Sequence, residues 1–421
     1  MLVAMMAGLV IVCTNVLAAD WPQWRGVNRD AVWSETGIVE KFPKDGLKVL
    51  WRTNISSGYS GPVVSDGLVY ITDLIDKPDS CERVLCFDAK TGKKIWSYSY
   101  PCKYKIGYPA GPRSSLVIEG GKAYSLGAMG DMLCFDAKSG KVLWHENLKE
   151  VFNIKMPIWG IAANPLIYGD LIITQIGGSD GACVVGLAKN TGKEKWRSVS
   201  DKASYSAPII IKQAGKDVLV CWTGTRITGM NPLDGKIYWD CYYGESNYAM
   251  NISTPVKSGE YIFVSAFFEG SMLIKLDKEK LAAKIAWKRK GESEKHTDAL
   301  HCTISTPILS GDNIYGVDSY GQLRCLDLLT GDRVWENLNA VPKARWANIH
   351  MVRNSDKVWM FNERGELLIT KLSIEGFQEI SRTKLIEPTE EQLDLRGGVC
   401  WSHPAYAYKH IYIRNDNELL T

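Results

Sequence analysis

Short apolar runs alternate with turn residues along nearly the whole chain, a pattern typical of β-strands joined by hairpins. Residues 114–144 show it well: SSLVIE is followed by a Gly120-Gly121 turn, KAYSLGA by a Gly130-Asp131 turn, and MLCFDA by a Ser-Gly turn before KVLW. Glycine supplies the positive φ that tight hairpin loops need. The pattern therefore predicts a four-stranded antiparallel unit.

This unit recurs, and a similar phrase of about eleven residues ends each copy. The phrases read CFDAKTGKKIW (86–96), CFDAKSGKVLW (134–144), GLAKNTGKEKW (186–196), GMNPLDGKIYW (229–239), LDKEKLAAKIAW (276–287, longer and without Gly), CLDLLTGDRVW (325–335) and TKLSIEGFQEI (370–380). Their closing residues lie 43 to 52 residues apart. Four-stranded units at such a period predict the blades of a β-propeller.

The two ends of the chain supply the parts of one further blade. An unpaired KVLW ending at Trp51 precedes the first complete repeat, and the tail from His403 has strands but no closing phrase. Joining them gives an all-β, eight-bladed propeller whose ring is closed by the N-terminal strand, which removes an exposed sheet edge. Seven blades is the competing count.

The closing tryptophans have a structural role in this prediction. An indole at a fixed place in each blade can be buried against the next blade, for about 4 to 6 kcal/mol of gross burial each. We expect this docking role, and substantial burial, for Trp51, Trp96, Trp144, Trp196, Trp239, Trp287 and Trp335.

The repeated phrase resembles the tryptophan-docking motif of the pyrroloquinoline-quinone (PQQ) type β-propeller repeats. That family includes quinoprotein alcohol dehydrogenases and the propeller lipoprotein of the outer-membrane β-barrel assembly machine. The resemblance extends from Trp21 to the end, and WPQWRGVNRDAVWSETGI (21–38) is similar to the leader of exported PQQ-like proteins without assigned activity. It implies the fold, whereas function must be argued from a site.

The resemblance also defines what a quinoprotein enzyme would require. Those enzymes hold PQQ over the axis, usually beneath a disulfide between adjacent cysteines, with Ca²⁺ bound by carboxylate and amide side chains. This sequence has no Cys-Cys pair, and no Asp or Glu stands in a matching context. We therefore predict no catalytic residue, no cofactor and no metal, with PQQ and Ca²⁺ as the alternative. His296, Asp298 and His301 could share a metal on one loop, although an incidental spacing is the preferred interpretation.

A second recurrence points to a binding mouth. Most repeats begin their first strand with Pro, which suits a position that donates no ladder hydrogen bond. First strands line the channel of a propeller, so residues near these prolines should crowd one rim of it. The candidate ligand-binding residues are Tyr59, Tyr108, Arg113, Trp159, Tyr205, Asn251, His301, Trp346 and Trp401. Aromatic residues around a concavity suit ligand binding, and sealing of a narrow channel is the structural alternative.

Composition and the N-terminus bear on location and partners. The net charge of +3 comes from interspersed acidic and basic residues, which argues against nucleic-acid binding. Residues 1–19 read as a signal peptide, 20–46 as an extension packing on the propeller, and 47–421 as the propeller. We expect an exported, periplasmic or extracellular monomer without a transmembrane segment. Lipidation at Cys13 and a disulfide between Cys81 and Cys102 stay open.

These observations favour an exported, non-catalytic binding or scaffold propeller that uses its funnel mouth for a protein or a small ligand. A PQQ-dependent dehydrogenase of alcohols or sugars is the first alternative, and an outer-membrane protein assembly factor is the second.

Overall fold

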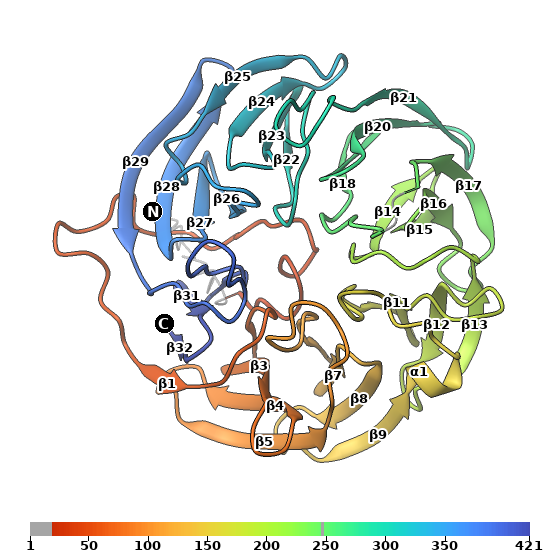
Figure 1. Cartoon of the computed structure of the whole chain (residues 1–421), viewed down its shortest axis with the longest axis vertical. Coiled ribbons are helices and arrows are strands. Elements are labelled where there is room, and N and C mark those ends of the chain that lie inside the picture. Colours follow the sequence, from red (N-terminus) through yellow and green to blue (C-terminus); the bar gives the residue numbers. More distant parts are fainter. Residues whose placement is uncertain (1–18, 246–247) are drawn as a thin grey trace, which may run out of the picture.

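Eight four-stranded antiparallel sheets stand around a central axis in the computed structural model, which describes residues 19–245 and 248–421. Figure 1 shows the ring seen along the axis, with the first strand of each blade innermost and the fourth on the outside. The all-β, eight-bladed propeller is thereby confirmed. The expected signal peptide lies almost entirely outside the described residues.

Blades 1 to 4 follow the chain in order. Their strands are β2 Val63–Ser65, β3 Leu68–Ile75, β4 Cys81–Asp88 and β5 Lys94–Pro101; β6 Val117–Glu119, β7 Lys122–Leu126, β8 Asp131–Asp136 and β9 Val142–Asn147; β10 Leu166–Tyr168, β11 Leu171–Gln175, β12 Val184–Ala188 and β13 Glu194–Ser198; β14 Ile209–Gln213, β15 Lys216–Trp222, β16 Arg226–Met230 and β17 Ile237–Tyr242. One short helix, α1, spans Leu148–Val151 after blade 2.

Blades 5 to 7 continue the same arrangement, and blade 8 joins both ends of the chain. Their strands are β18 Val256–Ser258, β19 Tyr261–Ala266, β20 Gly270–Leu276 and β21 Ala283–Arg289; β22 Ile308–Ser310, β23 Asn313–Val317, β24 Leu323–Asp327 and β25 Arg333–Asn337; β26 Ile349–Asn354, β27 Lys357–Asn362, β28 Glu366–Ser373 and β29 Gly376–Lys384; β30 Ala405–Ala407, β31 His410–Arg414, β32 Glu418–Leu420 and β1 Arg52–Asn54.

Blade 8 closes the ring by the pairing of strands that lie more than 360 residues apart. Strand β1 pairs antiparallel with β32, with Arg52 opposite Leu420 and Asn54 opposite Glu418. The Leu50 amide extends this ladder by donating to the Thr421 carbonyl at 2.8 Å. The strand begins just after the KVLW piece, so closure by the N-terminal strand is confirmed with a boundary one residue later than Trp51.

A β-bulge recurs where each phrase folds back on itself. In blade 1 Cys86 lies opposite Trp96 but Phe87 lies opposite Lys94, so Ile95 is the extra residue. In most blades the residue facing the indole is small: a Cβ built on Gly186 would lie 2.3 Å from the indole of Trp196, whereas in blade 5 the facing residue is Leu273. This explains the Cys or Gly at the start of most phrases.

The indole then reaches the following blade. Trp96 Nε1 donates to the Ala137 carbonyl at 2.9 Å, and a Cβ on Gly140 would lie 2.5 Å from the same ring. The phrase glycine is thus both the turn residue of its own blade and the seat of the preceding indole. Of the seven tryptophans, four are buried and three half-buried; the half-buried ones are Trp144, Trp287 and Trp335.

Blade 5 lacks the turn glycine, and a glutamine replaces the direct contact. Trp239 Nε1 donates at 2.9 Å to Gln213 Oε1, within its own blade. Gln213 Nε2 in turn donates to the carbonyls of Asp277, Lys280 and Ala282 in blade 5, the shortest at 2.7 Å. The amide therefore bridges two blades where the irregular phrase provides no seat for the ring.

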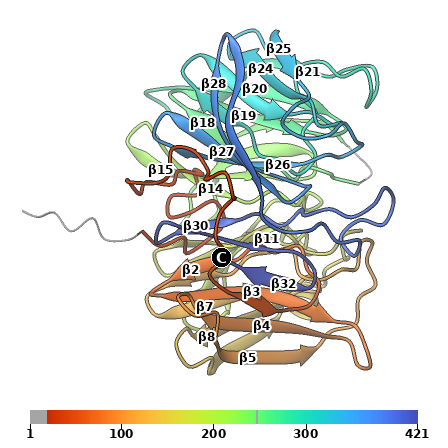
Figure 2. The same cartoon turned by 90° about the vertical axis from the view of Figure 1, so that its left-hand side faces the viewer.

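The extension at 20–46 crosses one end of the ring before β1, as Figures 1 and 2 show. It is bonded to blade 1 through Trp21 and Val64, to the edge of blade 3 through Arg29 and the Pro165 carbonyl at 2.7 Å, and to blade 7 through Asn354. Because these contacts reach widely separated blades, the extension covers the axial channel at that end.

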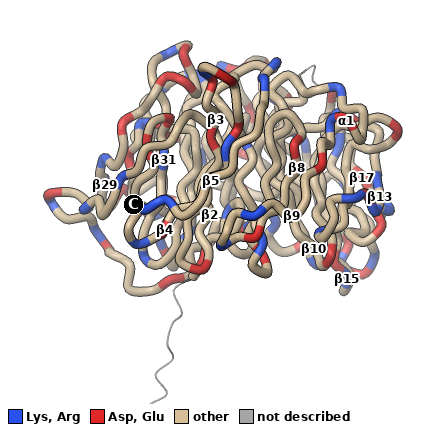
Figure 3. Tube along the Cα trace, turned by 90° about the horizontal axis from the view of Figure 1, so that it is seen from below, with Lys and Arg blue, Asp and Glu red and all other residues tan. Residues whose placement is uncertain are grey.

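In the view of Figure 3, Lys and Arg alternate with Asp and Glu along the trace, without a separate region of either sign. Among the described residues no helix has the length and apolar character that a bilayer-spanning segment needs.

Candidate axial binding site

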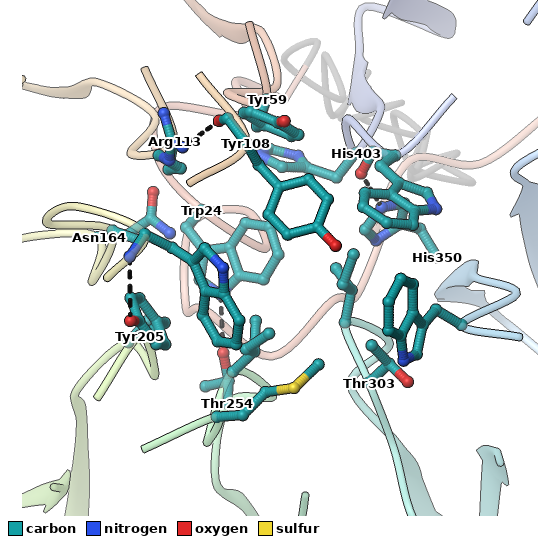
Figure 4. A pocket seen from close by; sticks show the side chains of 18 of the residues that line it. Trp24, Tyr59, Tyr108, Arg113, Asn164, Tyr205, Thr254, Thr303, His350 and His403 are labelled. Carbon is teal, nitrogen blue, oxygen red and sulfur yellow. Dashed lines mark hydrogen bonds between the residues drawn. The ribbon is translucent and has the colours of Figure 1, made fainter. Parts of the chain in front are cut away.

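A cavity of about 440 Å³ lies on the axis at the end opposite the extension's crossing. Its lining comes mainly from the segments that lead from the outer strand of one blade to the inner strand of the next, such as 102–116 and 248–255. Figure 4 shows these side chains converging on one space. The extension supplies Trp24 at the bottom, which makes the cavity blind.

The structure brings together seven of the nine residues predicted for the mouth. Those lining the cavity are Tyr59, Tyr108, Arg113, Trp159, Tyr205, Trp346 and Trp401. Asn251 and His301 do not line it. Asn251 is buried and its Nδ2 donates to the Thr223 carbonyl at 2.8 Å. His301 bonds the Phe267 carbonyl through Nδ1 at 2.8 Å and accepts from the Gly291 amide through Nε2.

Asn251 and His301 lie in segments that reach the cavity, but neighbouring residues, not these two, line it. In the same segments Met250 and Ile252 flank Asn251, and Thr303 and Ile304 follow His301, and these neighbours line the cavity. Side chains alternate in direction along an extended segment, so the correct segment was identified with the wrong side chain. The lining residues that were not among the nine candidates are Trp24, Ala162, Asn164, Ala207, Tyr248, Met250, Ile252, Thr254, Phe268, Thr303, Ile304, Arg345, His350 and His403; Asn164, Ala207, Thr254 and His403 directly precede the prolines of the recurrence.

Aromatic rings form the walls. The rings of Trp159 and Tyr248 are stacked with centroids 6.1 Å apart, and Tyr248 stacks on Phe268 at 5.8 Å. The indole nitrogen of Trp401 donates to Glu363 Oε2 at 3.1 Å, outside the cavity lining, and Glu363 is itself paired with Arg396. Trp401 is therefore fixed in place before any ligand arrives.

The floor consists of Trp24 and two histidines. Trp24 Nε1 donates to Thr254 Oγ1 at 2.8 Å, and its ring meets His403 edge-on with centroids 4.4 Å apart. Burial lowers the pKa of His350 to about 4 and that of His403 to about 3, and each charge would also be repelled by Arg25. Both imidazoles are neutral at physiological pH, so the floor is apolar and uncharged.

Two guanidinium groups supply the only charged side chains of the lining within the described residues. Arg113 donates to the carbonyls of Gly107, Tyr108 and Gly111 and lies over the Tyr59 ring at 4.8 Å. Arg345 is exposed, pairs with Glu294 at 2.7 Å and lies 4.2 Å above the centroid of Trp346. No carboxylate lines the described part of the cavity.

This lining does not fit a metal-bound quinone. A hard cation such as Ca²⁺ takes oxygen ligands that commonly include carboxylates, and no carboxylate is among the described residues of the lining. The described residues contain no group of three His, Cys, Asp or Glu side chains placed to hold a metal. In particular, His296 is exposed, Asp298 pairs with Arg289 at 2.8 Å, and His301 is engaged as described above.

The ten cysteines from Cys81 to Cys400 form no disulfide at the axis. Cys81 and Cys102 are free thiols, and Cys81 lies opposite Pro101 in the β4–β5 ladder, so Cys102 follows on the other side of the strand. The remaining described cysteines are buried and free.

Comparison with known proteins agrees with this architecture. A family model described as outer membrane protein assembly factor BamB matches residues 35–98 and 105–337, well over half of the chain. The chain belongs to this family of PQQ-like propellers. No curated protein matches the sequence.

Solved structures related to this family share its fold at low sequence identity. BamB from Moraxella catarrhalis has a TM-score of 0.57 and 15% identity, covering 88% of this chain and 97% of that one. A europium-containing methanol dehydrogenase has a TM-score of 0.63 and 12% identity, and the match covers 96% of this chain and 89% of the dehydrogenase. The quinohemoprotein alcohol dehydrogenase from Comamonas testosteroni has a TM-score of 0.59 and 13% identity, and the match covers 95% of this chain and 80% of the dehydrogenase. Such identities show the fold alone.

Proposed function

We propose that this protein is an exported, non-catalytic binding propeller whose axial cavity receives an apolar, ring-bearing part of a small ligand or of a protein partner. The observation that supports this most directly is the lining itself: a blind, aromatic-walled cavity whose described residues include no carboxylate. Its volume of about 440 Å³ lies in the range of small-molecule sites.

The chemistry of the walls restricts the ligand class. Stacked rings such as Trp159 and Tyr248 offer flat faces to an aromatic or aliphatic ring. An organic cation would meet two guanidinium groups and no carboxylate, and would be repelled. A neutral or anionic ring is therefore favoured, with Arg345 at the rim as the exposed positive charge.

Catalysis is not part of the proposal because the lining lacks a general base or nucleophile in a productive arrangement. The imidazoles of His350 and His403 lie beneath Trp24 and accept or donate within the protein: His350 Nε2 bonds the Trp401 carbonyl at 2.8 Å, and His403 Nε2 bonds Ser115 Oγ at 2.8 Å. Export rests on the resemblance of the N-terminal stretch to exported PQQ-like proteins and on the family named above.

The proposal is tested with anilinonaphthalene sulfonate, an apolar aromatic anion whose fluorescence rises on burial. We expect saturable binding at one site, weakened about tenfold or more by Ile304→Lys, which places an ammonium group among the rings. The matched control is Ile95→Lys, because Ile95 is 47% exposed on the outer strand of blade 1.

Absence of saturable binding to the wild type would contradict the proposal. Equal affinities for the two lysine variants would place the dye somewhere else and would count equally against the axial site. Circular dichroism of both variants checks that each is folded.

A role in outer-membrane protein assembly is the second candidate, and the description of the matching family model favours it. It predicts that the tagged protein, expressed in its native host, co-purifies with an integral β-barrel component of the outer membrane. Recovery of the protein alone under mild detergent extraction would argue against this role. It would leave the ligand-binding assay above unaffected.

A further inference from the structure

Three arginines gather at the end of the axial channel that the extension covers. Arg25 and Arg29 come from the extension and are 9% and 6% exposed, and Arg353 is the last residue but one of the inner strand of blade 7. Arg353 repels the charge of Arg25, and Arg25 repels that of Arg29. This positive cluster has no part in the lining of the large cavity.

The Arg29 guanidinium donates hydrogen bonds to neutral acceptors, and no carboxylate pairs with its positive charge. Its terminal nitrogens donate to the carbonyls of Asn164 at 2.9 Å and Pro165 at 2.7 Å and to Gln23 Oε1 at 3.1 Å, while its Nε is buried without a partner. These contacts hold the extension on blade 3. They place a full positive charge in a buried environment.

Arg25 is even less compensated. Its Nε donates to the Arg29 carbonyl at 3.3 Å, and its two terminal nitrogens form no hydrogen bond or ion pair with the described residues, although they are not among the fully buried polar atoms. Asp30 acts on it only at longer range, because the Asp30 carboxylate accepts from the Val32 amide at 3.1 Å and forms no ion pair with Arg25. Desolvation lowers the pKa of Arg25 to about 10, so the group stays charged at neutral pH.

A second, small cavity of about 20 Å³ lies beside this guanidinium. Arg25, Trp24, Ala31, His350 and His403 are among its lining residues, and it offers no carboxylate. Trp24, His350 and His403 line both this cavity and the large one, so the two cavities are neighbours at the floor. Buried charges in proteins are paired with a counterion, because an isolated one costs several kcal/mol of desolvation.

We propose that this small cavity binds a halide-sized inorganic anion, with the Arg25 guanidinium as its main ligand. The volume suits a monoatomic ion and is small for phosphate or sulfate. The anion would balance the cluster and hold the loop 25–31, whose Arg25, Arg29 and Ala31 all have positive φ between 55° and 61°. Since Trp24 precedes Arg25, the anion would keep the floor of the ligand cavity closed.

The test measures the melting temperature while chloride replaces gluconate at constant ionic strength. Gluconate is too large for the site. We expect the melting temperature of the wild type to rise by about 1–2 °C for each tenfold increase in chloride above the dissociation constant. Arg25→Met should lose this dependence. Arg25→Lys, which keeps a positive charge, should retain part of it.

Arg52→Met is the matched control, because Arg52 forms an exposed ion pair with Glu418 at 2.7 Å and should leave the chloride dependence unchanged. A crystal soaked in bromide gives an independent readout, an anomalous peak within hydrogen-bond distance of Arg25. The proposal is wrong if Arg25→Met keeps the wild-type dependence, if phosphate but not chloride stabilises the wild type, or if bromide produces no such peak. None of these outcomes depends on a ligand in the large cavity.

Discussion

Acidification from pH 6.5 to pH 4 should destabilise this propeller by on the order of 5 kcal/mol through two buried histidines. The pKa of His350 is lowered to about 4 and that of His403 to about 3, from an ordinary value of 6.5, mainly by burial. In this pH window the unfolded chain binds protons that the folded chain does not. Stability that is fully present above pH 6.5 is therefore lost as the pH falls, by about 3 kcal/mol for each group at pH 4.

Urea unfolding at several pH values between 7 and 4 checks this expectation. The double variant with His350→Gln and His403→Gln has no titrating group at the floor and should show a clearly flatter pH dependence. His145→Gln is the control, since His145 is exposed on the outer strand of blade 2, where its Nε2 lies 2.9 Å from Asp131 Oδ1. If wild type and double variant lost stability equally over this window, the floor histidines would not be responsible.

Trp96→Ala should lower the free energy of unfolding by about 3–5 kcal/mol. The indole is 9% exposed, donates to the Ala137 carbonyl of blade 2 at 2.9 Å and stacks on Phe135 with centroids 5.6 Å apart. The substitution removes burial, a hydrogen bond and an inter-blade contact together. Trp144→Ala should cost less, because Trp144 is only half-buried. Denaturant titration of both variants measures the difference.

Alanine variants of two glycines of blade 2 distinguish the cost of disturbing the indole contact from the cost of the left-handed backbone conformation. Gly121 and Gly140 have φ of +73° and +72°, but a Cβ on Gly121 would meet nothing within 4 Å, whereas one on Gly140 would clash with Trp96. Gly121→Ala should cost about 1 kcal/mol for the left-handed backbone alone, and Gly140→Ala about 1–3 kcal/mol more. Equal losses for the two alanine variants would mean that the seat of the indole contributes little to stability.

The blade repeat was readable from the sequence because its determinants are local. A turn glycine, a small residue opposite the indole and the indole itself lie within eleven residues. The bulge and the hairpin of each such repeat therefore follow from residues that are close together in the sequence. The phrase of blade 5 lacks the turn glycine, and there the local sequence is not enough. No residue near Trp239 in the sequence indicates that its indole donates to Gln213 instead of packing on a turn glycine of the next blade.

The cavity was only partly readable. Proline spacing identified the segments that reach the rim, since each precedes an inner strand, and seven of nine predicted residues line the cavity. The choice of side chain failed at Asn251 and His301, because it depends on the path of each segment. The ring of His301 is held by the Phe267 carbonyl and the Gly291 amide, partners that no local pattern indicates.

By itself, then, the sequence determined the all-β class, the blade repeat and the closure of the ring by the N-terminal strand, because these follow from short-range turns and from complementary incomplete ends. Only the tertiary structure decided that the channel is blind and that its floor is Trp24 above two neutral histidines. That arrangement depends on the extension being fastened to blade 3 by Arg29, more than 130 residues away in the chain. Contacts at such a distance depend on the assembled ring and have no signature in local sequence.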